Sequence, residues 1–264
     1  MIRVAINGAC GRMGSEIILL ALEDKELRVA AALEYHAHPQ IGADIGAALG
    51  RGTLGLAVSH TLAAEADVLI DFTDPAASME ALWICQDRKM AMVIGTTGHT
   101  TEQKASIEDV AETIPIVLAP NMSVGVTVLF ELVRRAAQLL DERYDVEIIE
   151  AHHRFKKDAP SGTAKGLVEA IVDGRKSEGA KVVYGRAGAV GERGQGEIGV
   201  HAVRAGDIVG DHTVMFARTG ERVELTHRAH SRQGFARGAI RAAKFVFGKR
   251  PGLYTMRDVL GIEG

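Results

Sequence analysis

The pattern of apolar and polar positions divides the chain into two parts. In the first part, short runs of mostly apolar residues alternate with helical patterns, and the runs span residues 2–6, 27–33, 66–73, 90–98 and 114–121. Strands that are apolar on both faces and alternate with helices are typical of a parallel sheet with helices on both sides. We therefore predict an α/β domain whose ligands bind beyond the carboxyl ends of the strands.

The second part of the chain alternates more clearly between apolar and polar residues. Four segments, residues 181–184, 197–204, 208–216 and 222–228, have strand patterns and are joined by glycine turns. This alternation predicts an antiparallel or mixed sheet with one covered face, and therefore a second, smaller α+β domain. The apolar side of several of these strands is a candidate subunit interface.

A glycine-rich turn follows the first strand and precedes the first helical pattern. Gly8, Gly11 and Gly14 are spaced G-x-x-G-x-x-G, a variant of the dinucleotide fingerprint, in the order of strand, turn and helix that this fingerprint requires. Gly8 permits the tight turn, Gly11 allows the backbone to approach a pyrophosphate, and Gly14 allows the helix to pack on the strand. Because the chain has 30 glycines, the spacing alone is weak evidence.

The end of the second strand strengthens the dinucleotide interpretation. Glu34 lies 20 residues after Gly14, where an acidic side chain accepts hydrogen bonds from the adenosine ribose. Tyr35 stands where an arginine is expected if the site binds a 2′-phosphate, although Arg12 in the turn is another candidate cation. We expect a mild preference for NADH over NADPH.

Residue types suited to proton transfer and anion binding are gathered in the stretch Glu150-Ala-His-His-Arg-Phe-Lys-Lys-Asp-Ala-Pro-Ser-Gly-Thr163. A strand over residues 145–149 precedes it and a helix over residues 164–172 follows, with Ser161 and Thr163 available as helix caps. The stretch contains two imidazoles and three cationic side chains beside a helix N-terminus. This combination predicts a carboxylate receptor with proton donors and acceptors, and hence an active site for an acidic small molecule.

Composition excludes several classes of protein. The net charge of −3 argues against a general nucleic-acid surface. No apolar run is long enough to span a bilayer, and a strand at residue 2 leaves no room for a signal peptide. Two cysteines make neither a disulfide framework nor a cysteine metal cluster, so we expect a cytoplasmic protein. We predict no metal site, because His152 and His153 are neighbours that point to opposite faces of a strand.

The central stretch resembles the signature of the 4-hydroxy-tetrahydrodipicolinate reductase family. Further similarity lies in residues 4–14, 70–73, 93–98, 121–125, 204–212 and 256–260, so the resemblance extends over the whole chain. It implies a Rossmann-like dinucleotide domain, residues 1–122 completed by 232–264, and a substrate and tetramerisation domain, residues 123–231. It also implies reduction of a cyclic dicarboxylate by NADH or NADPH in the diaminopimelate route to lysine, by a homotetramer.

The resemblance also assigns individual residues. His152 and Lys156 match the proton-transfer residues of the family, and His153, Gly162 and Thr163 match its substrate contacts; from the residues themselves we add Arg154 and Ser161 as substrate contacts. The cofactor residues would be Gly8, Ala9, Cys10, Gly11, Arg12, Met13, Glu34, Gly95, Thr96, Thr97, Ala119, Pro120, Asn121 and Met122. Two positions depart from the family pattern: Phe155 replaces a histidine of many members, and Tyr35 replaces the arginine of some.

Two other interpretations stay open from the sequence. The chain could be a dinucleotide sensor without turnover, since a fold never determines function by itself. It could also be a dehydrogenase of another amino or hydroxy acid, such as an aspartate dehydrogenase. The clustered His152, Arg154 and Lys156 argue against a sensor, because a sensor needs no proton donors beside an acid-binding turn.

Overall fold

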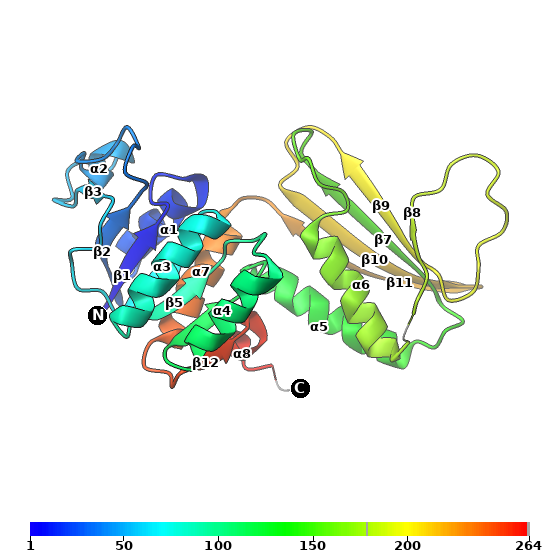
Figure 1. Ribbon diagram of the computed structural model, residues 1–264. Coiled ribbons are helices and arrows are strands. Elements are labelled where there is room, and N and C mark those ends of the chain that lie inside the picture. The colour runs from blue at the N-terminus through cyan, green and yellow to red at the C-terminus, as the bar shows by residue number, and fades with distance from the viewer. Residues whose placement is uncertain (178, 263–264) are drawn as a thin grey trace. The chain divides into compact units, whose positions relative to one another are not determined.

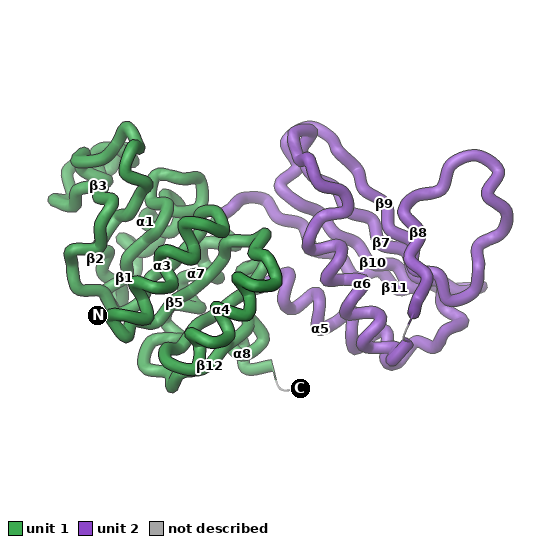
Figure 2. The backbone as a smooth tube through the Cα atoms, viewed as in Figure 1, with its two compact units in different colours: residues 1–124, 233–264 green, residues 125–232 purple. Residues whose placement is uncertain are grey.

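The computed structural model describes residues 1–177 and 179–262 and consists of two compact units. Unit 1 comprises Met1–Val124 with Gln233–Gly264, and unit 2 comprises Gly125–Arg232 (Figure 2). The sequence interpretation divides the chain after residues 122 and 231. Within the described residues, no helix is both long and apolar enough to cross a membrane.

Unit 1 is built on a seven-stranded parallel sheet (Figure 1). In the order β12-β6-β5-β4-β1-β2-β3, its strands are Gly252–Tyr254, Pro115–Leu118, Ala91–Ile94, Val68–Asp71, Ile2–Asn7, Leu27–Leu33 and Val58–Ser59. Its helices are α1 (Arg12–Glu23), α2 (Ile45–Ala48), α3 (Pro75–Asp87), α4 (Thr101–Ala111), α7 (Gln233–Val246) and α8 (Met256–Leu260). The predicted Rossmann-like parallel sheet is confirmed.

Helices cover both faces of this sheet, as the continuously apolar strands predict. One core cluster joins the sheet to α1 and α7, through residues such as Ile17 and Ala239. The other joins it to α3 and α4, through Leu82 and Ile107. Strand β4 is buried at all four positions and contributes Val68 and Ile70 to the first cluster and Leu69 to the second.

The C-terminal segment returns to complete unit 1. Helix α7 presents small residues to the sheet, and a Cβ on Gly238 would lie only 1.7 Å from the carbonyl oxygen of Met122. Strand β12 then pairs with β6, with Gly252 opposite Pro115. The close approach of α7 therefore depends on a glycine that the sequence pattern alone does not single out.

Unit 2 is a five-stranded mixed sheet covered by two helices (Figure 1). In the order β11-β10-β7-β9-β8, its strands are Glu221–Ala229, Gly210–Arg218, Asp145–His152, Ile198–Arg204 and Val182–Tyr184. Helices α5 (Val124–Leu139) and α6 (Gly162–Arg175) pack on one face, where Val146, Ile148 and Phe216 form the core. The predicted α+β domain with a mixed sheet is confirmed.

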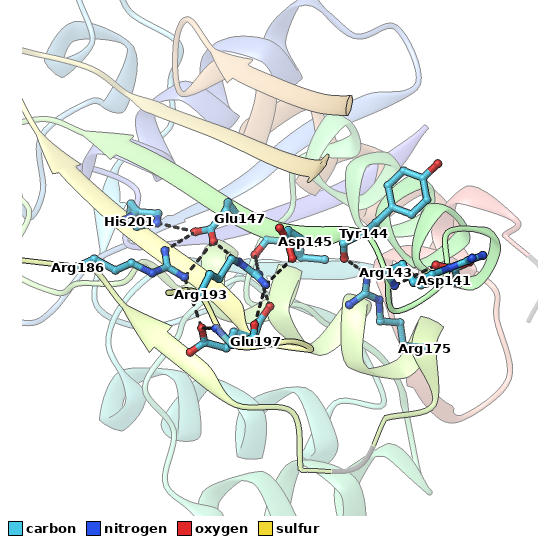
Figure 3. A network of polar contacts seen from close by, with 12 residues as sticks. Asp141, Arg143, Tyr144, Asp145, Glu147, Arg175, Arg186, Arg193, Glu197 and His201 are labelled. Carbon is cyan, nitrogen blue, oxygen red and sulfur yellow. Dashed lines mark hydrogen bonds and ion pairs between the residues drawn. The ribbon is translucent and has the colours of Figure 1, made fainter. Parts of the chain in front are cut away.

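The opposite face of the same sheet carries a polar network that fastens the segment before β9 (Figure 3). The carboxylate of Glu147 accepts hydrogen bonds from Arg186, from Arg193 at 3.0 Å and from Nε2 of His201 at 2.7 Å. Gly199 on β9 lies opposite Glu147, and a Cβ on Gly199 would lie 1.8 Å from Oε2 of Glu147. Residue 199 is therefore glycine because the glutamate needs that space.

Candidate active site

The glycine turn of unit 1 links the end of β1 to α1. Gly8 has φ of +77°, and the N–H groups of Gly8 and Ala9 donate to the carbonyl oxygen of Leu33 at 3.0 and 2.9 Å. A Cβ on Gly14 would lie 2.1 Å from the carbonyl oxygen of Gly8. The turn therefore allows the close approach of helix and strand that a pyrophosphate site requires. The N-cap of α1, Gly11, brings no side chain, so the first N–H groups of the helix are available to a phosphate.

Glu34 lies beside this turn at the end of β2. Its Oε2 accepts a hydrogen bond from the backbone N–H of Cys10 at 3.0 Å. Burial, and then the nearby Glu34, raise the pKa of the Cys10 thiol. A surface pocket joins these elements and is lined by Gly8, Gly11, Glu34, Tyr35, His36, His60, Phe72, Thr73, Asp74, Ala76, Ala77 and Glu80. The structure thus brings Gly8, Gly11 and Glu34 to one pocket, as the fingerprint predicts.

A buried carboxylate, which sequence reasoning missed, ties the carboxyl ends of three neighbouring strands together. Asp71 is fully buried and accepts hydrogen bonds from Asn7 Nδ2 at 2.8 Å, from Thr73 Oγ1 at 2.7 Å and from Thr96 Oγ1 at 2.6 Å. The Thr96 hydroxyl also accepts the backbone N–H of Thr73 at 2.8 Å. Because this hydroxyl is used within the protein, a cofactor contact at Thr96 would involve its backbone.

The remaining predicted cofactor residues differ in what they present. Ala119 and Met122 are buried, and a Cβ on Gly95 would lie 2.3 Å from the Phe72 ring, so these three would contact a cofactor through the backbone. Asn121 Oδ1 accepts the N–H of Ser123 at 2.8 Å. Arg12, Thr97 and Pro120 are exposed, while Met13 packs partly against the core.

In unit 2, the predicted site is organised around Glu150, which is fully buried on the helix-covered face of β7. Its carboxylate accepts hydrogen bonds from both terminal nitrogens of Arg204, at 2.8 and 2.9 Å, and from the backbone N–H of Ser161 at 3.0 Å. Nδ1 of His152 lies 2.6 Å from its Oε2. Burial alone would raise the pKa of Glu150, but the hydrogen bonds from Arg204, His152 and Ser161 outweigh burial and hold it below its ordinary value.

The state of Glu150 determines the tautomer of His152. An ionised carboxylate only accepts hydrogen bonds, so Nδ1 of His152 carries a proton and Nε2 is the nitrogen that exchanges protons. Burial lowers the pKa of His152, and the hydrogen bond to Glu150 offsets part of this effect. The imidazole is therefore oriented by one carboxylate, an arrangement suited to general acid–base catalysis.

A second buried histidine, His212 on β10, lies beside this pair. Its ring centroid is 5.2 Å from that of His152, and its Nε2 is 3.1 Å from Ser161 Oγ, which also caps α6 by accepting the N–H of Ala164. Burial, and then the nearby His152, lower the pKa of His212 to about 4. Neither His212 nor Arg204 was predicted as a site residue, although the 204–212 segment was recognised as part of the family resemblance.

The loop after β7 carries the cations of the candidate site. Lys156 pairs with Asp158 at 2.8 Å and its side chain is 22% exposed, whereas Arg154 is exposed and lies 6.0 Å from the centre of the Phe155 ring. His153 is half-buried. Phe155 is 79% exposed and therefore does not take the buried position of a proton relay.

The first turn of α6 lies beside the Glu150 cluster and offers backbone N–H groups. Ser161 is buried, and its N–H and Oγ are used by Glu150, His212 and α6 itself. Gly162 opens the helix, and a Cβ at this position would meet no atom within 4 Å. Since N–H groups of a first helical turn have no acceptor inside the helix, the backbone at Gly162 is better placed than Ser161 to hold a carboxylate, and Thr163 is the next residue of this turn.

Two family models match nearly the whole chain. The model described as dihydrodipicolinate reductase, N-terminus, matches residues 2–122, and the model described as dihydrodipicolinate reductase, C-terminus, matches residues 125–260.

Individual proteins give the same result. The 4-hydroxy-tetrahydrodipicolinate reductase of Geotalea uraniireducens is 48% identical over 267 residues, with 100% of both chains covered. That of Rubrobacter xylanophilus is 51% identical over 261 residues, with 98% of both chains covered. Among solved structures, the dipicolinate-bound dihydrodipicolinate reductase from Paenisporosarcina sp. TG-14 matches with a TM-score of 0.76 and 27% identity, covering 98% of this chain and 99% of that one.

Proposed function

The chain belongs to the family of dihydrodipicolinate reductases, also called 4-hydroxy-tetrahydrodipicolinate reductases, and from this premise we propose how its residues perform the reaction. The protein is an oxidoreductase of the diaminopimelate route to lysine, which reduces 4-hydroxy-tetrahydrodipicolinate to tetrahydrodipicolinate. A nicotinamide dinucleotide, when bound, supplies the hydride. The chain supplies binding, orientation and a proton.

The dinucleotide would be held by unit 1. The turn from Gly8 to Met13 would bind the pyrophosphate through backbone N–H groups at the start of α1. The carboxylate of Glu34 would accept the ribose hydroxyls. Gly95, Thr96, Thr97 and residues 119–122 would line the nicotinamide end, and the Asp71 cluster keeps the backbone of Thr96 in place.

The single observation that carries the proton chemistry is the 2.6 Å contact between Glu150 and Nδ1 of His152. It leaves Nε2 of His152 as the proton-exchanging atom, and Lys156 is the nearby ammonium in the family signature. Addition of hydride to the unsaturated ring of the substrate builds negative charge, which a cation stabilises. We therefore assign proton transfer to His152 and Lys156 together.

The substrate has two carboxylates, and the site offers groups for both. Gly162 and Thr163 would hold one on the first turn of α6, where the helix dipole favours an anion. His153 and Arg154 would contact the other end of the substrate. Ser161, which is bonded internally, would position Glu150 and α6 rather than contact the substrate.

Three finer properties belong to the same proposal. We propose NADH as the preferred cofactor, because the pocket beside Glu34 is lined by three carboxylates, those of Glu34, Asp74 and Glu80, and by no lysine or arginine among the described residues. A 2′-phosphate would therefore meet negative charge without a strong cation. We also propose a cytoplasmic homotetramer, in keeping with the family resemblance.

The experiment that tests the function is cofactor oxidation with freshly condensed pyruvate and aspartate semialdehyde, using NADH and NADPH in parallel. We expect rapid turnover by the wild-type protein. A His152→Ala, Lys156→Ala double variant should lose turnover by about 10⁴-fold while binding cofactor normally. Folded, cofactor-bound wild-type protein without turnover would contradict the reductase function and favour a dinucleotide sensor.

A further inference from the structure

We propose that Cys10, Glu34 and His38 form a binding site for Zn²⁺, and that zinc bound there excludes the dinucleotide. One potential ligand atom of each residue lies within 4.8 Å of the other two. All three residues belong to unit 1 and are only partly buried, so a metal ion has access to them. The second half of the proposal rests on the cofactor role of Glu34.

Backbone connections bring these three residues together. The N–H groups of Gly8 and Ala9 tie the glycine turn to Leu33, and the N–H of Cys10 donates to Glu34. The chain then turns back after β2, where the N–H of His38 donates to the carbonyl oxygen of Tyr35 at 2.9 Å. The local fold therefore places the three residues next to one another in unit 1.

The chemistry of the three ligands favours zinc over calcium or magnesium. A thiolate, a carboxylate and an imidazole are all zinc ligands, whereas calcium and magnesium prefer oxygen ligands alone. A thiolate and a carboxylate together carry two negative charges, which balance the charge of Zn²⁺. The Glu34 carboxylate accepts one hydrogen bond on each oxygen, from the backbone N–H groups of Cys10 at 3.0 Å and Tyr35 at 3.4 Å, so each oxygen keeps a lone pair for a metal. Three protein ligands leave the fourth tetrahedral position for water.

Metal binding changes one local hydrogen bond. Nδ1 of His38 accepts the backbone N–H of Gln40 at 3.2 Å. A metal on Nδ1 would replace this donor, and a metal on Nε2 would place the ring proton on Nδ1, so the bond is lost in either case. One long, solvent-exposed hydrogen bond is a small cost compared with three metal–ligand bonds.

Occupation by zinc has a direct consequence for the enzyme. The carboxylate of Glu34 that would ligate the metal is also the proposed acceptor for the adenosine ribose hydroxyls, and Cys10 lies in the pyrophosphate turn. The same oxygen atoms cannot serve both ligands. Zinc and the dinucleotide should therefore bind competitively, and zinc should inhibit turnover with a pattern that excess NADH reverses.

The test is titration of the full-length, cofactor-free protein with Zn²⁺ by calorimetry, with Co²⁺ as a spectroscopic probe. We expect Co²⁺ to give a thiolate-to-metal charge-transfer band that Cys10→Ala abolishes. Removal of a residue that only hydrogen-bonds to a metal ligand typically weakens metal binding by about 10–100-fold. Removal of a ligand itself should cost at least as much, so His38→Ala should weaken Zn²⁺ binding by about 10–100-fold or more. His36→Ala is the matched control, because this exposed histidine of the same loop lies outside the cluster, and its Zn²⁺ affinity should equal that of wild type.

Each outcome decides between the two halves of the proposal. Zinc binding that is unchanged in both Cys10→Ala and His38→Ala, or absent from the wild-type protein, overturns the metal site. Zinc binding that depends on both residues and is displaced by NADH supports the whole proposal. Zinc binding that depends on both residues but is unaffected by saturating NADH keeps the metal site and overturns the ribose role of Glu34.

Discussion

The carboxylate of Glu150 lies 2.6 Å from Nδ1 of His152, and the same carboxylate accepts two hydrogen bonds from Arg204. Arg204 keeps Glu150 ionised, and ionised Glu150 keeps the proton of neutral His152 on Nδ1. A residue of β9 therefore determines, through a glutamate of β7, which nitrogen of the histidine exchanges protons. Because Glu150, His152 and Arg204 are joined by hydrogen bonds, substitution of any one of them should impair proton exchange at His152.

Glu150→Gln should separate the orientation of His152 from its presence. The amide has the same shape, but it can donate a hydrogen bond to Nδ1 and so favour the wrong tautomer. We expect kcat to fall by about 10²-fold, within the range ascribed to general acid–base catalysis. Since Glu150 raises the pKa of His152, the limb of the pH–rate profile that reports this histidine should move to lower pH.

The control for this variant is Glu131→Gln on α5, which weakens another glutamate–arginine pair, with Arg134 at 2.7 Å, outside the site. It should leave kcat and the pH profile unchanged. Glu150→Gln also removes the negative charge beside the partly buried Arg204, which destabilises a folded unit. Near-UV circular dichroism of both variants therefore checks that unit 2 is folded. An unshifted pH profile in folded Glu150→Gln would contradict the orienting role.

Gly162→Ala should weaken substrate binding without harming the fold. A Cβ at this position meets no atom within 4 Å, and alanine is well accepted in the first turn of a helix. If a substrate carboxylate lies on this turn, the methyl group intrudes on it, and KM should rise by about 10-fold with an unchanged melting temperature.

Gly14→Ala is the contrasting variant in unit 1. Its Cβ would lie 2.1 Å from the carbonyl oxygen of Gly8 and 2.9 Å from Cα of Ala9, which are backbone atoms that cannot easily move. We expect a lower melting temperature and weaker NADH binding.

For the Gly162→Ala variant, an unchanged KM would exclude the first turn of α6 as the carboxylate receptor.

The sequence predicts the sheets better than it predicts the site. Continuous apolar runs indicate a parallel sheet because burial on both faces allows few polar residues, and this is what the structure shows. The cluster around Glu150 depends instead on strand pairing. Glu150 lies opposite His212 on β10, and His152 lies opposite Arg204 on β9, so residues more than fifty positions apart meet. No local sequence pattern predicts the register in which β7 pairs with β9 and β10.

The limits of β7 show the same effect on a smaller scale. The β-branched pattern predicts a strand that ends at residue 149, but the structure continues it to His152 because β9 offers partners through Arg204. The extension places Glu150 and His152 two residues apart on one face of the sheet, which is why their side chains meet. Asp71 was missed for a similar reason, since its three donors come from three different strand ends.

Tyr35→Arg should shift cofactor choice towards NADPH. Tyr35 is 60% exposed and lines the pocket beside Glu34, so an arginine at this position could reach a 2′-phosphate without disturbing the core. One charge-assisted contact of about 1.4 kcal/mol corresponds to a 10-fold change, which we expect in the ratio of kcat/KM for NADPH to that for NADH. Tyr35→Leu, which removes the ring without adding charge, should leave the ratio within about twofold of wild type.

The wild-type ratio tests the underlying proposal directly. If the unmodified protein already prefers NADPH by 10-fold or more, another cation such as Arg12 binds the phosphate and Tyr35 is not decisive. Arg12→Ala would then lower NADPH use specifically.

Glu147 should make the stability of unit 2 depend on pH. Burial would raise its pKa, but hydrogen bonds from Arg186, His201 and Arg193 outweigh burial and lower it to about 2, against 4.5 for the free side chain (Figure 3). Because the folded-state pKa is depressed, the stabilisation is fully present above pH 4.5 and is lost as the pH falls towards 2. With the side chain one-fifth exposed, its size is on the order of 2 kcal/mol.

Glu147→Gln should therefore lower the urea midpoint of unit 2 at pH 7 and lose less stability than wild type between pH 4.5 and pH 2. Glu224→Gln is the matched control, since this glutamate lies on β11 in the same sheet but pairs only with the exposed Arg222 among the described residues. Its stability should follow the wild-type pH dependence. Equal pH dependence in Glu147→Gln and wild type would mean that Arg186, Arg193 and His201 order the segment before β9 without stabilising the sheet.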